Sequence, residues 1–153
     1  MTPEGSLHVE GIELPNPNPA VANYVRSVRV GSLLFVSGHG PMREGKPAIT
    51  GKLGADLDVN EGREAARVVT INVLATLKAE LGELSRVRRV VKLLVMVNAT
   101  PDFTDHPKVA DGSTDLLVKV FGDEGRPARS AVGVGSLPGN IAVEIEGIFE
   151  IDS

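Results

Sequence analysis

The segment from Asp58 to Gly82 constrains the fold of this chain more than any other part of the sequence. Asp58 is followed three residues later by Glu61, a spacing typical of a capping box with Asp as the N-cap. Behind it, apolar residues recur every three or four positions at Ala66, Val69, Val73, Leu77 and Leu81. Val68, Ile71 and Leu74 widen this face, and Gly82 is a suitable C-cap. We therefore expect one long helix that packs with a broad apolar face against a sheet.

Runs rich in β-forming residues on both sides of this helix supply the strands. The runs 24–30 and 33–36 flank a Gly31-Ser32 pair, a pattern that predicts a hairpin. Val90 to Val97 is apolar apart from Lys92, which indicates an internal, central strand covered on both faces. These runs already exclude an all-helical fold.

The C-terminal half repeats the alternation of helix and strand. A second helix is predicted over about Ser113 to Phe121, with an earlier start at Lys108 as an alternative that Gly112 disfavours. The strands 129–134 and 141–151 follow it. In the last strand Val143 and Ile145 alternate with Glu144 and Glu146. Because side chains on a strand alternate between faces, this pattern predicts one buried face and one wet face.

The order of elements predicts the fold class. Residues 1–22 contain Gly and Pro too often for a helix and are expected to be irregular, and residues 38–54 are expected to be a loop. The remaining order is strand, strand, helix, strand, helix, strand, strand. We therefore predict an α+β fold in a single domain over residues 1–153, with a mixed sheet and both helices packed on one face.

The composition excludes several functional classes. Cysteine is absent, which removes disulfides, thiolate nucleophiles and cysteine metal sites, and His8, His39 and His106 lack the spacing of metal ligands. A net charge of −4 and an aromatic content of 3% weigh against a nucleic-acid surface. The chain has neither a signal-peptide pattern at its start nor an apolar stretch long enough for a membrane helix. We expect a cytoplasmic protein with no membrane association.

Several motifs occur together in an order that resembles a known family. The C-terminal part contains Pro127-Ala128-Arg129-Ser130-Ala131-Val132, then Leu137-Pro138, then Val143-Glu144-Ile145-Glu146-Gly147-Ile148. Earlier, Gly31 precedes Leu34-Phe35-Val36-Ser37-Gly38, and Val90-Val91-Lys92 leads to Asp102-Phe103. Together these motifs cover residues 24–151 and resemble the reactive-intermediate deaminase family, also described as YjgF-like, RidA-like or L-PSP endoribonuclease-like.

This resemblance implies a chorismate-mutase-like fold and a homotrimer with sites in the clefts between subunits. The activity it implies is the hydrolysis of reactive enamines and imines, such as 2-aminoacrylate, to 2-keto acids and ammonia. Neither a metal nor an organic cofactor is needed for that reaction. Some members are instead described as endoribonucleases or translation inhibitors, and many have no known activity.

The resemblance also assigns roles to individual residues. Arg129 matches the arginine that pairs with the substrate carboxylate, and Glu144 matches the glutamate that guides water near the reacting carbon. Tyr24 occupies the place of the family's site tyrosine, judged by its spacing to Ser37 and Gly38. The hydroxyl of Ser37 and the backbone amide of Gly38 match the pair that lines the substrate pocket.

The chain departs from the family pattern at three places. His39 follows Gly38 where glutamine is usual, and we expect its side chain to line the pocket. Ala131 replaces a common cysteine. The asparagine expected before the second helix has no clear counterpart, and Asp111, Ser113 and Thr114 are the polar residues nearby. An Asp in that place would repel an anionic substrate.

The residue types alone support the same chemistry but leave alternatives open. The planar fork of an arginine holds a carboxylate with two parallel hydrogen bonds, and a partly buried glutamate such as Glu144 can guide water. Without the motifs, Arg129 and Glu144 would read as solvated charges, and Tyr24 as a residue that covers the core. Two other functions therefore remain: a trimeric protein that binds a small carboxylate without turnover, and an endoribonuclease.

Overall fold

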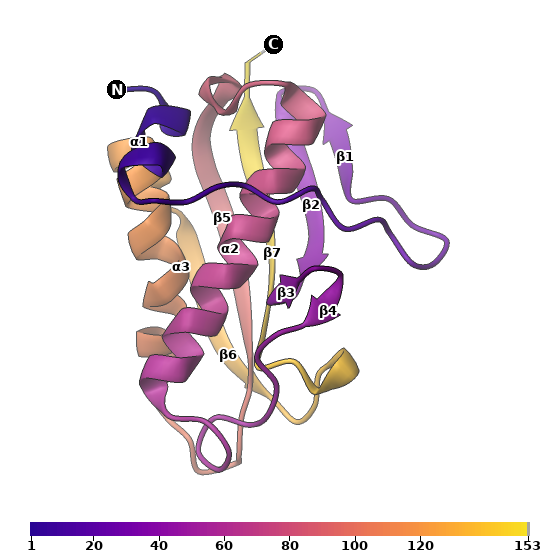
Figure 1. Cartoon of the computed structure of the whole chain (residues 1–153), viewed down its shortest axis with the longest axis vertical. Helices are drawn as coiled ribbons and strands as arrows, with labels where there is room; N and C mark the ends of the chain where they lie inside the picture. Colours follow the sequence, from indigo (N-terminus) through magenta and orange to yellow (C-terminus); the bar gives the residue numbers. More distant parts are fainter. Residues whose placement is uncertain (153) are drawn as a thin grey trace.

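The computed structural model describes residues 1–152 as one mixed sheet with its helices on one side (Figure 1). The strand order is β1-β2-β7-β5-β6, with β5 and β6 parallel and all other neighbours antiparallel. The strands are β1 (Ser27–Val30), β2 (Leu33–His39), β5 (Val87–Asn98), β6 (Ala128–Val134) and β7 (Val143–Ile151). The helices are α1 (Pro3–Val9), α2 (Val59–Leu81) and α3 (His106–Phe121), with 3-10 turns η1 (Leu84–Arg86), η2 (Gly122–Gly125) and η3 (Pro138–Asn140). The predicted α+β fold is confirmed, with α2 and α3 lying on the same face of the sheet.

Helix α2 has the predicted ends. The Asp58 side chain accepts from the Glu61 backbone N–H at 2.8 Å, and the Asp58 N–H donates to the Glu61 carboxylate at 3.0 Å. Gly82 ends the helix with φ 85°, a left-handed conformation that glycine adopts without steric cost. Most of the residues between these two ends are buried against β2, β7 and α3, as expected from the broad apolar face of the helix.

Helix α3 begins at His106, earlier than the predicted Ser113, because Gly112 serves close packing rather than breaking the helix. A Cβ on Gly112 would overlap the backbone carbonyl of Arg63 on α2. The missing side chain therefore lets the two helix backbones approach closely, which outweighs the low helix propensity of glycine.

The prediction that residues 1–22 are irregular is wrong for the stretch that forms α1. Thr2 caps this short helix by accepting from the Gly5 N–H at 3.0 Å. Glu4 accepts from Lys78 Nζ at 2.7 Å and from the Leu84 N–H at 2.9 Å, and the Leu7 side chain is 3% exposed in the core. Tertiary contacts thus stabilise a segment whose own composition does not favour a helix.

The predicted loop 38–54 likewise contains a short hairpin of β3 (Met42–Arg43) and β4 (Lys46–Pro47).

The second face of the sheet is not covered by helices (Figure 1). On β5, Leu93, Val95 and Val97 are buried on the helix side, whereas Leu94 and Met96 on the other side are half-buried. The expectation that β5 is central and covered on both faces is therefore wrong for the single chain, and β7 is the middle strand. This open face exposes Val28, Val30, Phe35 and Val132 by 41–61%.

None of the helices in the described residues is both long and apolar enough to cross a membrane.

Candidate functional site

A β-bulge shapes the end of β2. Val36 pairs with Gly147 and His39 with Ile145, so β2 contains one more residue than β7 between these two pairs. The extra residue falls at Ser37-Gly38, where the family motif lies. The Ser37 hydroxyl donates to the Val25 carbonyl at 2.6 Å. A bulge interrupts the ladder and redirects side chains, and such features are common beside functional sites.

Glu144 on β7 packs directly on this bulge. A Cβ on Gly38 would overlap the Glu144 carboxylate in its present position, so glycine lets this carboxylate lie directly on the bulge. Glu144 is half-buried, and this burial raises the pKa of its carboxyl group, with the like charge of Glu146 as a second cause. A carboxyl group with a raised pKa is better suited to proton transfer near neutral pH than an ordinary one.

Tyr24 lies next to the same bulge and is 44% exposed. It directly precedes Val25, whose carbonyl accepts from Ser37. Arg26 fastens this segment, since its Nε donates to the Asn18 carbonyl at 2.7 Å and its NH2 to the Pro19 carbonyl at 3.1 Å. The structure thus brings Ser37, Gly38 and Glu144 to one corner of the sheet, and the backbone of Tyr24 is one residue from the Val25 carbonyl that accepts from Ser37.

His39 does not join this corner. Its ring is 5% exposed and lies on the helix side, with Nε2 2.8 Å from Thr76 Oγ1 of α2 and Nδ1 2.6 Å from the Ser37 carbonyl. Burial lowers the pKa of the imidazole to about 4, against the opposing effect of the bond to Ser37, and Arg26 lowers it further. Because a carbonyl only accepts, the neutral ring donates from Nδ1 and accepts the Thr76 hydroxyl proton at Nε2. The expectation that the His39 side chain lines the pocket is therefore corrected.

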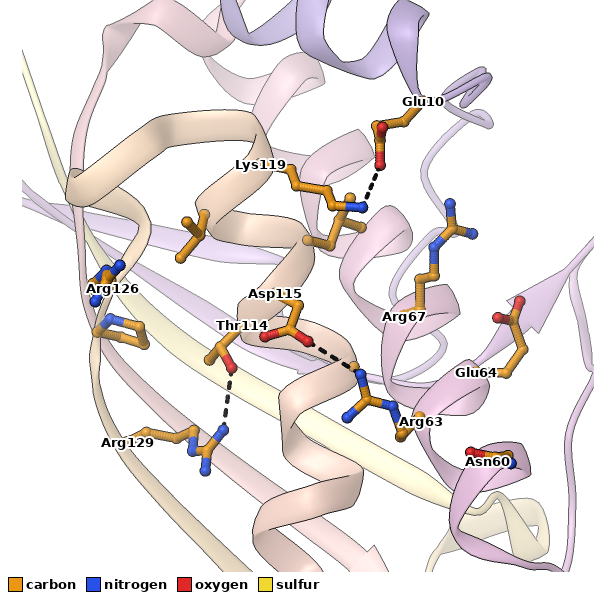
Figure 2. Close-up of a pocket in the computed structure, with 14 residues that line it drawn as sticks. Glu10, Asn60, Arg63, Glu64, Arg67, Thr114, Asp115, Lys119, Arg126 and Arg129 are labelled. Carbon is orange, nitrogen blue, oxygen red and sulfur yellow. Dashed lines mark hydrogen bonds and ion pairs between the residues drawn. The ribbon is translucent and has the colours of Figure 1, made fainter.

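Arg129 lies near the opposite edge of the sheet, on β6. It pairs with Leu93, a residue of the buried face, so its side chain leaves the sheet on the helix side. Its NH1 donates to Asp111 Oδ1 at 2.8 Å and to Thr114 Oγ1 at 3.1 Å, both on α3. Figure 2 shows the bond to Thr114. The Arg129 side chain remains 23% exposed. Thr114 and Asp111 thus hold the guanidinium in one orientation.

Arg129 lines one part of an open groove of about 850 Å³ (Figure 2). The other charged residues of this groove come from α2, α3 and the segments around them: Glu10, Arg63, Glu64, Arg67, Asp115, Lys119 and Arg126. Several of these charges are paired, with Arg63 3.1 Å from Asp115 and Lys119 2.9 Å from Glu10. The groove is therefore mixed in charge rather than strongly cationic.

One chain alone does not bring Arg129 and Glu144 together. Strand β5 separates β6 from β7, and neighbouring strands lie about 4.8 Å apart. The two side chains also leave the sheet on opposite faces, because Glu144 pairs with Met96 on the open face whereas Arg129 pairs with Leu93. Each chain thus carries two separate parts of the predicted site.

The sequence did not reveal two of the interactions that hold these parts in place. Asp111 was recognisable as a polar residue near the start of α3, but its bond to Arg129 depends on how α3 lies against β6. Thr76 lies in the middle of α2 among buried residues, and no pattern distinguishes it as the partner of His39. Across residues 1–152, no cluster of three or more His, Cys, Asp or Glu side chains is arranged to hold a metal ion.

Comparisons with known proteins give the family. Residues 4–146 match the family model described as "YjgF/chorismate_mutase-like, putative endoribonuclease". The chain is 46% identical to Protein TCP17 of Trypanosoma cruzi over 94% of this chain and 90% of the relative. It is 31% identical to a 2-iminobutanoate/2-iminopropanoate deaminase of Dermatophagoides farinae, over 89% of this chain and 91% of that protein. The crystal structure of Atu1372 from Agrobacterium tumefaciens, a protein of unknown function, superposes with a TM-score of 0.92 at 45% identity, covering 99% of this chain and 94% of that one. With this match over nearly its whole length, the chain belongs to the YjgF/chorismate-mutase-like family.

Proposed function

We propose that this protein is a cofactor-free deaminase that hydrolyses small enamine and imine intermediates to 2-keto acids and ammonia. The observation that carries the proposal is the half-buried Glu144 carboxylate seated on the bulge at Gly38, with its pKa raised. The family includes reactive-intermediate deaminases, and the similarity to a 2-iminobutanoate/2-iminopropanoate deaminase supports this class of substrate.

In the proposed reaction, Arg129 binds the substrate carboxylate, and Glu144 acts as the general base and then as the general acid. A water molecule attacks the carbon of the protonated imine while the Glu144 carboxylate takes one of its protons, which gives a neutral tetrahedral amino alcohol. Glu144 then returns that proton to the nitrogen. As the C–N bond breaks, the Glu144 carboxylate takes the hydroxyl proton, so that ammonia and a 2-keto acid are released. An enamine enters the same sequence after a proton is added to its β-carbon.

Tyr24 and the bulge would complete the substrate pocket. The Tyr24 hydroxyl can donate a hydrogen bond to the substrate. Gly38 lies against the Glu144 carboxylate, and the Ser37 hydroxyl donates to the Val25 carbonyl. In this scheme His39 does not touch the substrate. Its bond to the Ser37 carbonyl makes it a positioning residue for the bulge.

The proposal requires a second copy of the chain. Arg129 and Glu144 lie on opposite faces and in different parts of the sheet, so a site with both residues needs Arg129 of one copy and Glu144 of another. The uncovered apolar face with Phe35 and Val132 offers a surface for such an assembly. We propose a homotrimer, in keeping with the family resemblance, with sites between subunits.

The test is ammonia release from imines generated in place by an amino-acid oxidase. We expect the wild type to accelerate hydrolysis, and Arg129→Ala to reduce this by about 100-fold, since losing a charge-assisted pair costs ~3 kcal/mol. Arg126→Ala is the matched control: it removes an arginine of the same groove that is exposed and lies 3.8 Å from Asp123. Equal activity of the wild type and Arg129→Ala would rule out the proposal.

A carboxylate-binding protein without turnover is the second candidate. The pairing of Arg129 with Asp111 favours it, because the guanidinium already forms an ion pair within the chain. Binding of a 2-keto acid that depends on Arg129, without faster imine hydrolysis, would establish this function instead.

An endoribonuclease is the third candidate, and the cationic side chains of the groove in Figure 2 are the observation in its favour. The pairing of Arg63 and Lys119 with carboxylates and the net charge of −4 count against it. RNA cleavage that persists through repeated purification and disappears in Arg67→Ala would support it.

A further inference from the structure

The guanidinium of Arg129 has one edge held and one edge open. Its two NH1 protons go to Asp111 and Thr114, at 2.8 and 3.1 Å. NH2 reaches only the Pro107 carbonyl, at 3.5 Å, and Nε has no hydrogen-bond partner among residues 1–152. Nε and NH2 form the edge of the guanidinium that presents two parallel N–H groups, the geometry that fits one carboxylate.

The charges around this edge are already balanced. Asp111 lies between two arginines, with Oδ1 2.8 Å from Arg129 and Oδ2 4.0 Å from Arg63. Arg63 is in turn 3.1 Å from Asp115. Two arginines and two aspartates thus alternate across α2, α3 and β6. A carboxylate on the open edge of Arg129 adds a charge of −1 beside Asp111, whose own charge lies 2.8 Å from Arg129 and 4.0 Å from Arg63.

We infer that Asp111 sets the substrate class of the Arg129 site. It fixes the guanidinium so that a single carboxylate binds the Nε–NH2 edge, and its own charge rejects ligands that carry a second anionic group. Imino acids with a neutral or cationic side chain fit this environment, and the protonated nitrogen of a small imine is attracted to Asp111. Imines of acidic amino acids and phosphorylated acids are disfavoured. The inference rests on the proposed function for its reaction, whereas its ligand selectivity can be measured separately.

The size of the expected effect follows from the separation of the charges. A second carboxylate of the ligand, about 6 Å from the Asp111 carboxylate in a partly solvated groove, is repelled by it. This repulsion lowers the affinity of the ligand by about tenfold. Asp111 is 42% exposed, so solvent screening limits the effect to this range rather than the larger values of a dry interior. Asp111→Asn keeps an oxygen that accepts from NH1 and removes the charge alone, which makes it the informative variant.

The experiment compares the binding of 2-oxobutanoate, with one carboxylate, and 2-oxoglutarate, with two, by isothermal titration calorimetry. The wild type is expected to prefer 2-oxobutanoate by about tenfold, and Asp111→Asn to reduce this preference to about threefold or less by binding 2-oxoglutarate more tightly. Asp105→Asn is the matched control, because it makes the same charge change at the start of α3 but lies 3.6 Å from the exposed Lys108 and is not part of the groove lining. It is expected to keep the wild-type ratio.

Three results would overturn the inference: a ratio in Asp111→Asn equal to that of the wild type, an equal change in Asp105→Asn, or the absence of binding of either acid to the wild type. A merely structural role of Asp111 would weaken both acids alike and leave their ratio unchanged. Failure of the proposed deaminase activity is a separate result, since it would appear in the imine assay while the selectivity in calorimetry remained. Unfolding curves of the two Asn variants confirm that both are folded under the conditions of the titration.

Discussion

At the scale of single residues, the β2 bulge determines which side chains face the candidate site. The family motif leads us to expect Ser37 and His39 in the pocket, and on a regular strand both side chains would lie on one face. The extra residue at Ser37-Gly38 reverses the direction of the strand's later side chains, so His39 turns to Thr76 on α2. The motif around Arg129 and Glu144 was readable from the sequence, but a bulge depends on pairing with β7 and leaves no period in the sequence.

Gly38→Ala tests the contact between the bulge and Glu144. The added Cβ would overlap the Glu144 carboxylate, which can move because it is the end of a flexible side chain. We therefore expect imine turnover to fall at least about tenfold, while the free energy of unfolding changes by less than about 1 kcal/mol. Kinetics and urea unfolding measure the two effects. Gly135→Ala is the control, since a Cβ there would have no atom within 4 Å, and an equal loss of turnover in it would refute the interpretation.

The lowered pKa of His39 predicts that the stability of the protein depends on pH. Its pKa is about 4 in the folded protein and ordinary, near 6.5, in the unfolded chain, so the unfolded state binds more protons between these values. The stability from the neutral ring is therefore complete above pH 6.5 and is lost as the pH falls towards 4, by about 3 kcal/mol in total. In His39→Gln, urea unfolding at pH 7 and pH 5 should show a smaller loss than in the wild type. The same loss in both proteins would contradict the assignment.

At the scale of elements, the sequence predicted the helix and strands whose periodic patterns are long, and it missed those that depend on contacts. Both ends of α2 follow from local chemistry at Asp58 and Gly82. Helix α1 is only seven residues long, and its contacts with α2 and the core through Glu4 and Leu7 are what stabilise it. The sequence favours a start of α3 near Ser113 over one at Lys108, because glycine at position 112 has a low helix propensity. In the structure α3 begins at His106, and the missing side chain of Gly112 serves packing against α2.

Gly112→Ala separates helix propensity from packing. Propensity alone would make the variant more stable by about 1 kcal/mol. The new Cβ would overlap the backbone carbonyl of Arg63, which cannot move without shifting α2. We therefore expect a loss of at least about 2 kcal/mol in the free energy of unfolding, measured with urea. Lys108→Ala on the exposed side of α3 should change stability by less than about 0.5 kcal/mol, and a stabilised Gly112→Ala would disprove the close approach.

At the scale of the whole molecule, one chain does not bring the parts of the proposed active site together. Its helices cover one face of the sheet, and Val28, Phe35 and Val132 remain exposed on the other. We expect Phe35→Glu to dissociate the proposed trimer into monomers, because it places a charge on an apolar face that another subunit would cover. Sedimentation velocity would detect the change. A wild type that sediments as a monomer would refute the assembly.

The central claim is that Arg129 of one subunit and Glu144 of another form one active site. The most direct measurement is imine hydrolysis by mixed oligomers, made by co-expressing Arg129→Ala and Glu144→Gln chains with different tags. Each variant alone is expected to be inactive. In the mixture, a site receives an intact Arg129 and an intact Glu144 by chance, so activity should recover to about a quarter of the wild-type value. Mixed oligomers no more active than the two variants alone would contradict the account.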